Sequence, residues 1–257
     1  MPVSTSWLLV FVGLVGASIG SFLNVLIVRL PKDESIVRPR SRCPGCGNPI
    51  AAYDNIPIVS WLLLRGRCRN CKAGISIQYP LVELATALIW VGAAWYYGLT
   101  LDALAAALLG TILLGIAVTD VRHYLIPDEY TLGGLPVGLL LSLRAGLGGL
   151  VESLIGAAVG FTLLYLVAVI GEKVFRKEAM GGGDIKMMAM VGAFVGWKGV
   201  LLTIFGGSLL GTLVFAPLLV FRVKRLVPFG VFLAAAAAIT FVFGEEVVGW
   251  YLGWAMG

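Results

Sequence analysis

Residues 101–128 of the chain read LDALAAALLGTILLGIAVTDVRHYLIPD, an apolar run that ends at the charged residue Asp120. The apolar part, residues 101–119, is long enough to cross the hydrocarbon core of a bilayer, which is about 30 Å thick. The whole chain has this character, with 59% hydrophobic residues, 13% charged residues and a mean hydropathy of +0.96. Water-soluble domains are far less apolar. The sequence therefore predicts an all-α polytopic membrane protein.

Other apolar runs resemble residues 101–119, and together they predict about eight transmembrane helices. The runs at 130–143 and 185–197 are short for a span, so we expect those helices to begin in the preceding loops or to stop below the far surface. The first run is too long for the core of a signal peptide and is interpreted as an uncleaved span. The eight runs are residues 7–28, 81–97, 101–119, 130–143, 150–170, 185–197, 201–221 and 226–248.

Lysine and arginine residues gather in three loops, at residues 29–72, 173–177 and 222–225. Eight alternating spans place all three loops on one side of the membrane, and the positive-inside rule makes that side cytoplasmic. Only Arg144 and Lys198 then fall on the outer side. Topology thus accounts for the formal charge of +5, and no nucleic-acid partner is expected.

The longest polar segment, residues 31–79, divides the chain into three predicted parts. These are a first transmembrane helix at residues 1–30, a small cytoplasmic loop domain at residues 31–79 and a multi-helix transmembrane domain at residues 80–257. A loop of this size holds little apolar core, so we expect it to need a metal for its folding.

All four cysteines lie in this loop domain, in two Cys-x-x-Cys turns. Two such turns can close a tetrahedral zinc site with no open position, which suits a structural metal. Disulfide bonds are the alternative, but the reducing cytoplasm disfavours them. The predicted zinc ligands are Cys43, Cys46, Cys68 and Cys71.

Two acids lie at the ends of apolar runs, where ionisable groups are costly and usually have a function. Asp120 follows the run at 101–119, and Asp184 ends the sequence Met180-Gly181-Gly182-Gly183-Asp184. Two predicted spans separate these residues, so both aspartates are expected at the cytoplasmic membrane face.

A carboxylate pair of this kind can hydrolyse a peptide bond without a covalent intermediate. One carboxylate takes a proton from water while the other, still protonated, donates to the carbonyl oxygen. Gly181 and Gly183 would let an extended substrate backbone approach. Lys186 either polarises this site or is an interfacial lysine whose amine reaches toward water. Either aspartate alone would be interpreted as a helix cap.

The order of several motifs resembles that of the type IV prepilin leader peptidase family, whose members are bifunctional peptidases and N-methyltransferases. The resemblance includes the paired cysteine turns and a Gly-x-Gly-Asp element shared with other intramembrane aspartyl proteases. The remaining motifs are Gly20-Ser21-Phe22-Leu23-Asn24-Val25, Asp54-Asn55-Ile56-Pro57-Ile58-Val59-Ser60-Trp61, Leu64-Arg65-Gly66-Arg67-Cys68-Arg69, Tyr79-Pro80-Leu81-Val82-Glu83, Ile126-Pro127-Asp128 and Pro228-Phe229-Gly230.

The resemblance implies that Asp120 and Asp184 cleave the basic leader from type IV prepilin and type II secretion pseudopilin precursors. It also implies a bacterial inner-membrane location within the lipid bilayer, and methylation of the new N-terminal residue with S-adenosylmethionine as the donor. A nearby acid could accept the proton that methylation releases. The candidates Glu83, Glu172 and Glu178 are not ranked by the sequence, and the oligomeric state stays open.

Two other functions remain possible at this point. One is a peptidase that has lost methylation, which the intact cysteine pattern disfavours. The other is a non-enzymatic membrane component such as a transporter or an assembly factor. Carriers usually place their charged residues near the bilayer midplane and contain repeated halves. The acids of this chain lie at one edge of the membrane, and its sequence contains no clear repeat.

Overall fold

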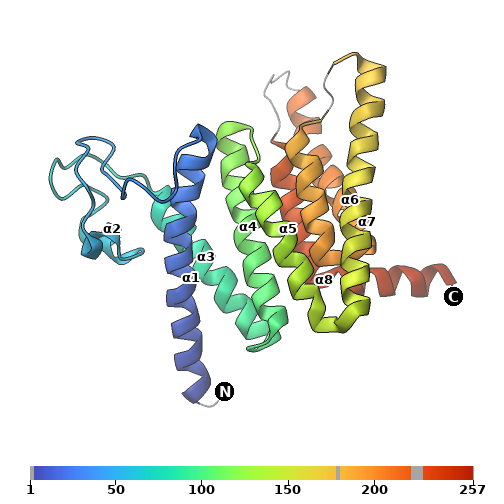
Figure 1. Ribbon diagram of the computed structural model, residues 1–257, viewed down its shortest axis with the longest axis horizontal. Helices are drawn as coiled ribbons and strands as arrows, with labels where there is room; N and C mark the ends of the chain where they lie inside the picture. Colours follow the sequence, from blue (N-terminus) through green and yellow to red (C-terminus); the bar gives the residue numbers. More distant parts are fainter. Residues whose placement is uncertain (1–2, 178–179, 221–227, 257) are drawn as a thin grey trace. The chain divides into compact units, whose positions relative to one another are not determined.

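The computed structural model describes residues 3–177, 180–220 and 228–256, and this part of the chain is helical, with two isolated β-bridges and no strand. The predicted all-α class is therefore confirmed. Figure 1 shows the long helices. They are α1 (Val3–Arg29), α3 (Gln78–Tyr97), α4 (Leu101–His123), α5 (Asp128–Ser142), α6 (Gly146–Phe175), α7 (Gly182–Val220) and α8 (Phe229–Met256).

Five helical stretches of the described residues are long and apolar enough to cross a membrane. Two of these stretches are interrupted, one by the 3-10 turn at Leu143–Ala145 between α5 and α6, and the other at Gly196 within α7, where φ is 67° and ψ is 177°. Helix α3 is not among the five, so this count does not confirm eight spans. The stretches are residues 6–32, 101–123, 128–175, 182–216 and 229–251.

The helices that belong to the two short apolar runs begin in the preceding loops, as expected. Helix α5 starts at Asp128 and α7 starts at Gly182. The sequence predicted a gap between two helices at residues 197–201, but the structure has only a local kink at Gly196 inside α7. The expected start of the last span at residue 226 lies outside the described residues, and α8 continues to Met256.

The chain divides into two compact units, Met1–Gly115 and Ile116–Gly257. In the first unit α1 packs along α3. A Cβ atom at Gly20 of α1 would lie 2.8 Å from the Glu83 Cα atom, so the two helices approach very closely there. Helix α3 in turn contacts α4, where Trp90 Nε1 donates to Thr111 Oγ1 at 3.0 Å. Small residues thus allow tight packing where lipid supplies no hydrophobic driving force.

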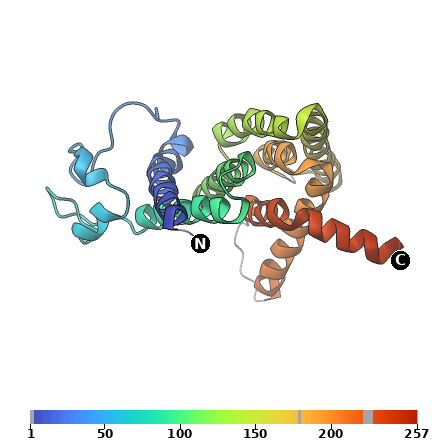
Figure 2. The ribbon, with the colours of Figure 1, turned by 90° about the horizontal axis from the view of Figure 1, so that it is seen from below.

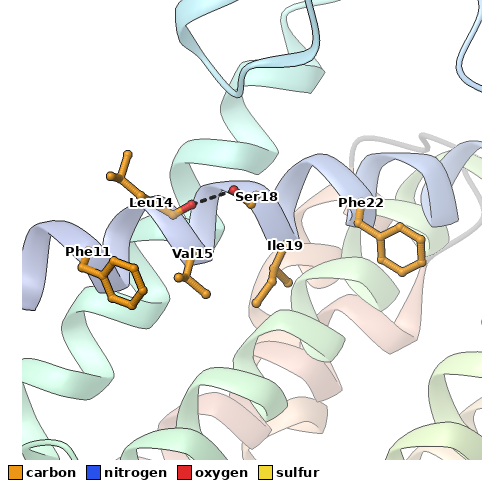
Figure 3. A pocket seen from close by; sticks show the side chains of 6 residues that line it. All are labelled: Phe11, Leu14, Val15, Ser18, Ile19 and Phe22. Carbon is orange, nitrogen blue, oxygen red and sulfur yellow. Dashed lines mark hydrogen bonds between the residues drawn. The ribbon is translucent and has the colours of Figure 1, made fainter. Parts of the chain in front are cut away.

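The outward side of α1 is apolar and shallowly grooved. Ser18 is the polar residue in this groove, and its hydroxyl donates to the Leu14 carbonyl oxygen at 2.9 Å (Figure 3). A satisfied hydroxyl on an otherwise apolar face suits contact with lipid. The groove is lined by Phe11, Leu14, Val15, Ser18, Ile19 and Phe22.

The polar segment between α1 and α3 forms a separate lobe beside α1, as Figure 2 shows. It contains the short elements Leu30–Lys32, Ala52–Asn55 and α2 (Val59–Leu63). This lobe carries the four cysteines.

The second unit contains the end of α4 and helices α5 to α8, with α5, α6 and α7 side by side in Figure 1. Helices α6 and α7 touch backbone to backbone at Gly156 and Gly192. A Cβ atom on either glycine would collide with the carbonyl oxygen of the other. The Ser153 hydroxyl beside them donates to the Ala193 carbonyl oxygen. Glycine on both helices therefore allows this close packing.

Candidate active site and metal centre

The two predicted catalytic aspartates lie at helix ends in the second unit. Asp120 is in the last turn of α4, where its side chain is buried with 6% exposure, and Asp184 is in the first turn of α7, where it is partly exposed. Their carboxyl groups are close enough to interact electrostatically. The structure thus brings together two residues that are far apart in the sequence.

The start of α8 forms a wall of the same site. A Cβ atom on Gly230 would lie 2.8 Å from Asp120 Oδ2, so only glycine leaves room for the carboxyl group. The backbone amides of Gly230 and Val231 approach this carboxyl group. Gly230 was not predicted as a site residue, although the Pro228-Phe229-Gly230 motif was a signal for it.

Ile126, in the connection between α4 and α5, links the two aspartate-bearing helix ends. A Cβ atom on Gly183 would lie 2.8 Å from Ile126 Cβ, and one on Gly230 would lie 2.8 Å from Ile126 Cδ1. The side chain of Ile126 is buried. It therefore fills the space between α7 and α8 beside the aspartates, a role that only the folded chain reveals.

One oxygen of each aspartate lacks a hydrogen-bond partner. Asp120 Oδ2 and Asp184 Oδ1 are buried, and neither atom makes a hydrogen bond of normal geometry with the described residues. Most buried polar atoms in proteins are paired, so two orphaned carboxylate oxygens in one place need an explanation. A site that receives a water molecule and a peptide carbonyl group supplies one.

The three residues predicted for substrate approach take different positions. A Cβ atom on Gly181 would be 3.5 Å from Asp184 Oδ2, so Gly181 borders the carboxyl group, and Gly183 packs on Ile126. Lys186 Nζ instead donates to both carboxylate oxygens of Asp128 at 2.7 Å. This ion pair connects the first turns of α5 and α7 on the exposed surface.

The four cysteines form a compact cluster in the loop lobe. Their sulfur atoms all lie within 4.8 Å of one another, and those of Cys43 and Cys71 are 3.7 Å apart without a disulfide. Tetrahedral zinc with bonds of about 2.3 Å would separate its sulfur ligands by about 3.8 Å. The donor set therefore fits a tetrahedral metal ion.

The two cysteine turns repeat one backbone design. Cys43 N–H donates to the Asn48 carbonyl oxygen at 2.9 Å, and Cys68 N–H donates to that of Ala73 at 2.8 Å. Backbone amides of Cys46 and Gly45 lower the pKa of the Cys43 thiol to about 7. Thiolates are the form that binds metal, so these amides prepare Cys43 as a ligand.

These features define an all-helical, multi-pass membrane protein with an aspartate pair at helix ends and a separate cluster of four thiols. Two family models match the chain: the bacterial peptidase A24 N-terminal domain over residues 14–97 and the type IV leader peptidase family over residues 107–216. No solved structure matches the chain.

Curated relatives agree with the family models. The prepilin leader peptidase/N-methyltransferase of Aeromonas hydrophila is 39% identical over 261 residues, which cover 91% of this chain and 90% of the relative. The protein of the same name from Pseudomonas aeruginosa is 38% identical over 94% of this chain and 92% of its own length. The Myxococcus xanthus relative is 43% identical, and the match spans 61% of its length. The chain belongs to the type IV leader peptidase family.

Proposed function

We propose that this chain removes the basic leader from type IV prepilin and pseudopilin precursors and methylates the new N-terminal residue. The observation that carries the peptidase proposal is the meeting of Asp120 and Asp184, each with a buried, unpaired carboxylate oxygen. Membership in a leader peptidase family supports the choice of substrate.

In the proposed cleavage, a water molecule lies between the two carboxyl groups. The ionised aspartate takes a proton from this water, and the protonated one donates to the oxygen of the scissile carbonyl group. Gly181 leaves space for an extended substrate backbone beside Asp184, whereas Gly183 serves the site by letting Ile126 pack against the start of α7. The resulting tetrahedral species collapses as a proton returns to the leaving amine.

The proposed topology has eight crossings in the bacterial inner membrane, with the aspartates at the cytoplasmic face. The interruptions in residues 128–175 and at Gly196 support it, because each divides one apolar stretch into two helical segments, and α3 supplies a further helix. The lysine and arginine residues of the loops support the orientation.

We further propose that Cys43, Cys46, Cys68 and Cys71 hold a structural zinc ion and that residues 31–79 act as a loop domain between the parts 1–30 and 80–257. The close packing of four thiols supports zinc over harder cations. S-adenosylmethionine would supply the methyl group as a sulfonium cation. Gln78 and Glu83 in the first unit have buried acceptor atoms, which suit a reaction between a cationic amine and a cationic methyl donor.

The test replaces each aspartate with its uncharged isostere in the purified, full-length protein. Asp120→Asn and Asp184→Asn are each expected to lower cleavage of a prepilin precursor by at least about 100-fold, because each removes a proton-transfer group. Asp102→Asn is the matched control, since it makes the same change in an exposed position in the first turn of α4. Full cleavage by either aspartate variant would overturn the mechanism.

A further inference from the structure

A second group of buried polar side chains lies in the first unit, between α1 and the first turns of α3. Asn24, Gln78 and Glu83 are only 1%, 9% and 7% exposed. Asn24 Nδ2 donates to the Tyr79 carbonyl oxygen at 3.0 Å, and Gln78 Nε2 donates to Asn24 Oδ1 at 3.4 Å. Polar side chains buried between apolar helices are costly and usually have a function. We call these three residues the α1–α3 polar cluster.

The free hydrogen-bonding capacity of this cluster includes unpaired acceptors. Gln78 Oε1 is buried, and no partner for it exists among the described residues. Glu83 Oε2 accepts from the Ile58 N–H at 2.7 Å, and the Ser21 hydroxyl also interacts with this carboxyl group. An ionised carboxylate can accept about four hydrogen bonds, so capacity remains at Glu83. Such a set of acceptors with one carboxylate suits a cationic donor, and a primary ammonium group is a compact one.

The bond to Glu83 also holds Ile58 in a rare backbone conformation. Ile58 has φ 62° and ψ −52°, a combination that β-branched residues seldom adopt. Strain of this kind persists only where the surroundings enforce it, and it is concentrated at ligand sites. Ile58 directly precedes α2 of the cysteine-bearing lobe. Glu83 therefore joins the polar cluster to that lobe.

We propose that the α1–α3 polar cluster binds the new N-terminal amino group of the cleaved pilin, and that Glu83 takes a proton from this group before methylation. This proposal rests on the proposed function, in which the chain methylates the new N-terminal residue. It also distinguishes Glu83 from Glu172, because Glu172 is exposed on α6. The third candidate, Glu178, lies outside the described residues.

The proposed step conserves atoms and charge. An ammonium group has no lone pair, so it first transfers one proton to the Glu83 carboxylate. The amine nitrogen then bonds to the methyl carbon of the sulfonium donor as the carbon–sulfur bond breaks and sulfur keeps its electron pair. The product is a methylammonium group, and protonated Glu83 returns its proton to solvent. No oxidant or reductant is required.

Glu83→Gln separates this role from simple support of the loop. The glutamine keeps the size of the side chain and an oxygen that can accept from Ile58 N–H, but it cannot take a proton. In full-length, metal-loaded protein we expect methyl transfer to cleaved pilin to fall by about 100-fold or more. Precursor cleavage and bound metal should stay at the wild-type level. Glu172→Gln is the matched control and should leave both activities unchanged.

A Glu83→Gln protein that methylates normally would overturn the proposal. So would one that loses its metal, because Glu83 would then serve as support for the loop. If the wild-type protein neither cleaved nor methylated, the proposed function would be refuted. Binding of a peptide to the protein tests the amine site independently of either activity.

The binding probe is a synthetic peptide of the mature pilin N-terminus, with a free amine or with an acetylated one. Wild-type protein should bind the free-amine form at least about tenfold more tightly, because acetylation removes a charge-assisted donor. Glu83→Gln should lose this preference while Glu172→Gln keeps it. Equal binding of the two peptides to the wild-type protein would overturn the amine site.

Discussion

Asp54 in the first unit and the aspartate pair in the second unit have opposite surroundings. In the first unit, Arg69 donates to the Asp54 carboxylate from Nε at 2.9 Å and from Nη2 at 2.6 Å. These hydrogen bonds hold the pKa of Asp54 below its usual value. In the second unit, Asp120 and Asp184 each keep an unpaired oxygen. A paired acid such as Asp54 stabilises the fold, whereas acids with unpaired oxygens remain available to a substrate. Glu83 does both, because it accepts a hydrogen bond from Ile58 and keeps further acceptor capacity.

The units also differ in what holds them together. The cysteine-bearing lobe consists of short turns around four thiols, so the metal proposed for this cluster would be its main source of folding free energy. The helices of the second unit approach through their backbones, as at Gly156 and Gly192. Damage to one unit should therefore spare the chemistry of the other, and substitutions can test this independence.

The largest effect is expected from loss of a metal ligand. Cys43→Ser should remove bound zinc and unfold the lobe, because structural zinc contributes about 10–16 kcal/mol of apparent binding free energy in small domains. Methylation should be lost while precursor cleavage stays within a few-fold of wild type. Metal analysis and the two activity assays measure these outcomes.

Asn70→Ser is the control for this substitution, because it alters an exposed residue of the second cysteine turn without removing a thiol. It should keep its zinc and both activities. If Cys43→Ser lost cleavage as completely as methylation, the independence of the two regions would be wrong.

The next effect is expected in the second unit, from a single methyl group between α6 and α7. Gly192→Ala places a Cβ atom against the Gly156 backbone, which cannot move aside as a side chain could. We expect a loss of about 3 kcal/mol in the free energy of unfolding. Thermal unfolding of the purified protein in detergent measures this change, and metal content should not change.

Gly133→Ala in α5 is the control, because a Cβ atom at that position meets no other atom within 4 Å. Alanine is a better helix former than glycine, so this variant should be as stable as wild type or more stable. Equal stability of Gly192→Ala and Gly133→Ala would contradict backbone contact between α6 and α7.

The sequence predicted the features that depend on composition or on short spacing. Apolar runs located the helices, and the Cys-x-x-Cys turns located the thiol cluster that the structure contains. It did not predict that Gly196 interrupts α7, because hydropathy does not report backbone dihedral angles. Nor could it predict the pairing of Lys186 with Asp128, which depends on the packing of two helix ends.

Gly230 shows the same limit within the active site. The Pro228-Phe229-Gly230 motif marks the position, but the role of Gly230 depends on the approach of α8 to Asp120, which the motif does not specify. Gly230→Ala should displace the Asp120 carboxyl group, since the added Cβ atom would lie 2.8 Å from Oδ2. A displacement approaching 1 Å in a catalytic group lowers rates by up to about 100-fold, so we expect cleavage to fall by about 10- to 100-fold.

Initial rates of precursor cleavage test this effect, with Gly249→Ala in α8 as the control because its Cβ atom would meet nothing within 4 Å. Methylation of cleaved pilin should be unchanged in both variants. A normal cleavage rate in Gly230→Ala would show that the Asp120 carboxyl group does not need its present position.

The smallest effect is expected from the exposed ion pair of Lys186 and Asp128. Exposed pairs of this kind contribute about 0.2–1 kcal/mol, so Lys186→Gln should reduce the free energy of unfolding by about 0.5 kcal/mol or less. A double-mutant cycle with Asp128→Asn isolates the pair, and cleavage is measured in the same proteins. Because Lys186 contacts Asp128 and not Asp184, we expect cleavage to change by less than about threefold. A tenfold loss of cleavage in Lys186→Gln that Asp128→Asn does not reproduce would instead assign Lys186 to substrate approach. An ion-paired residue of the second unit would then also act on the substrate.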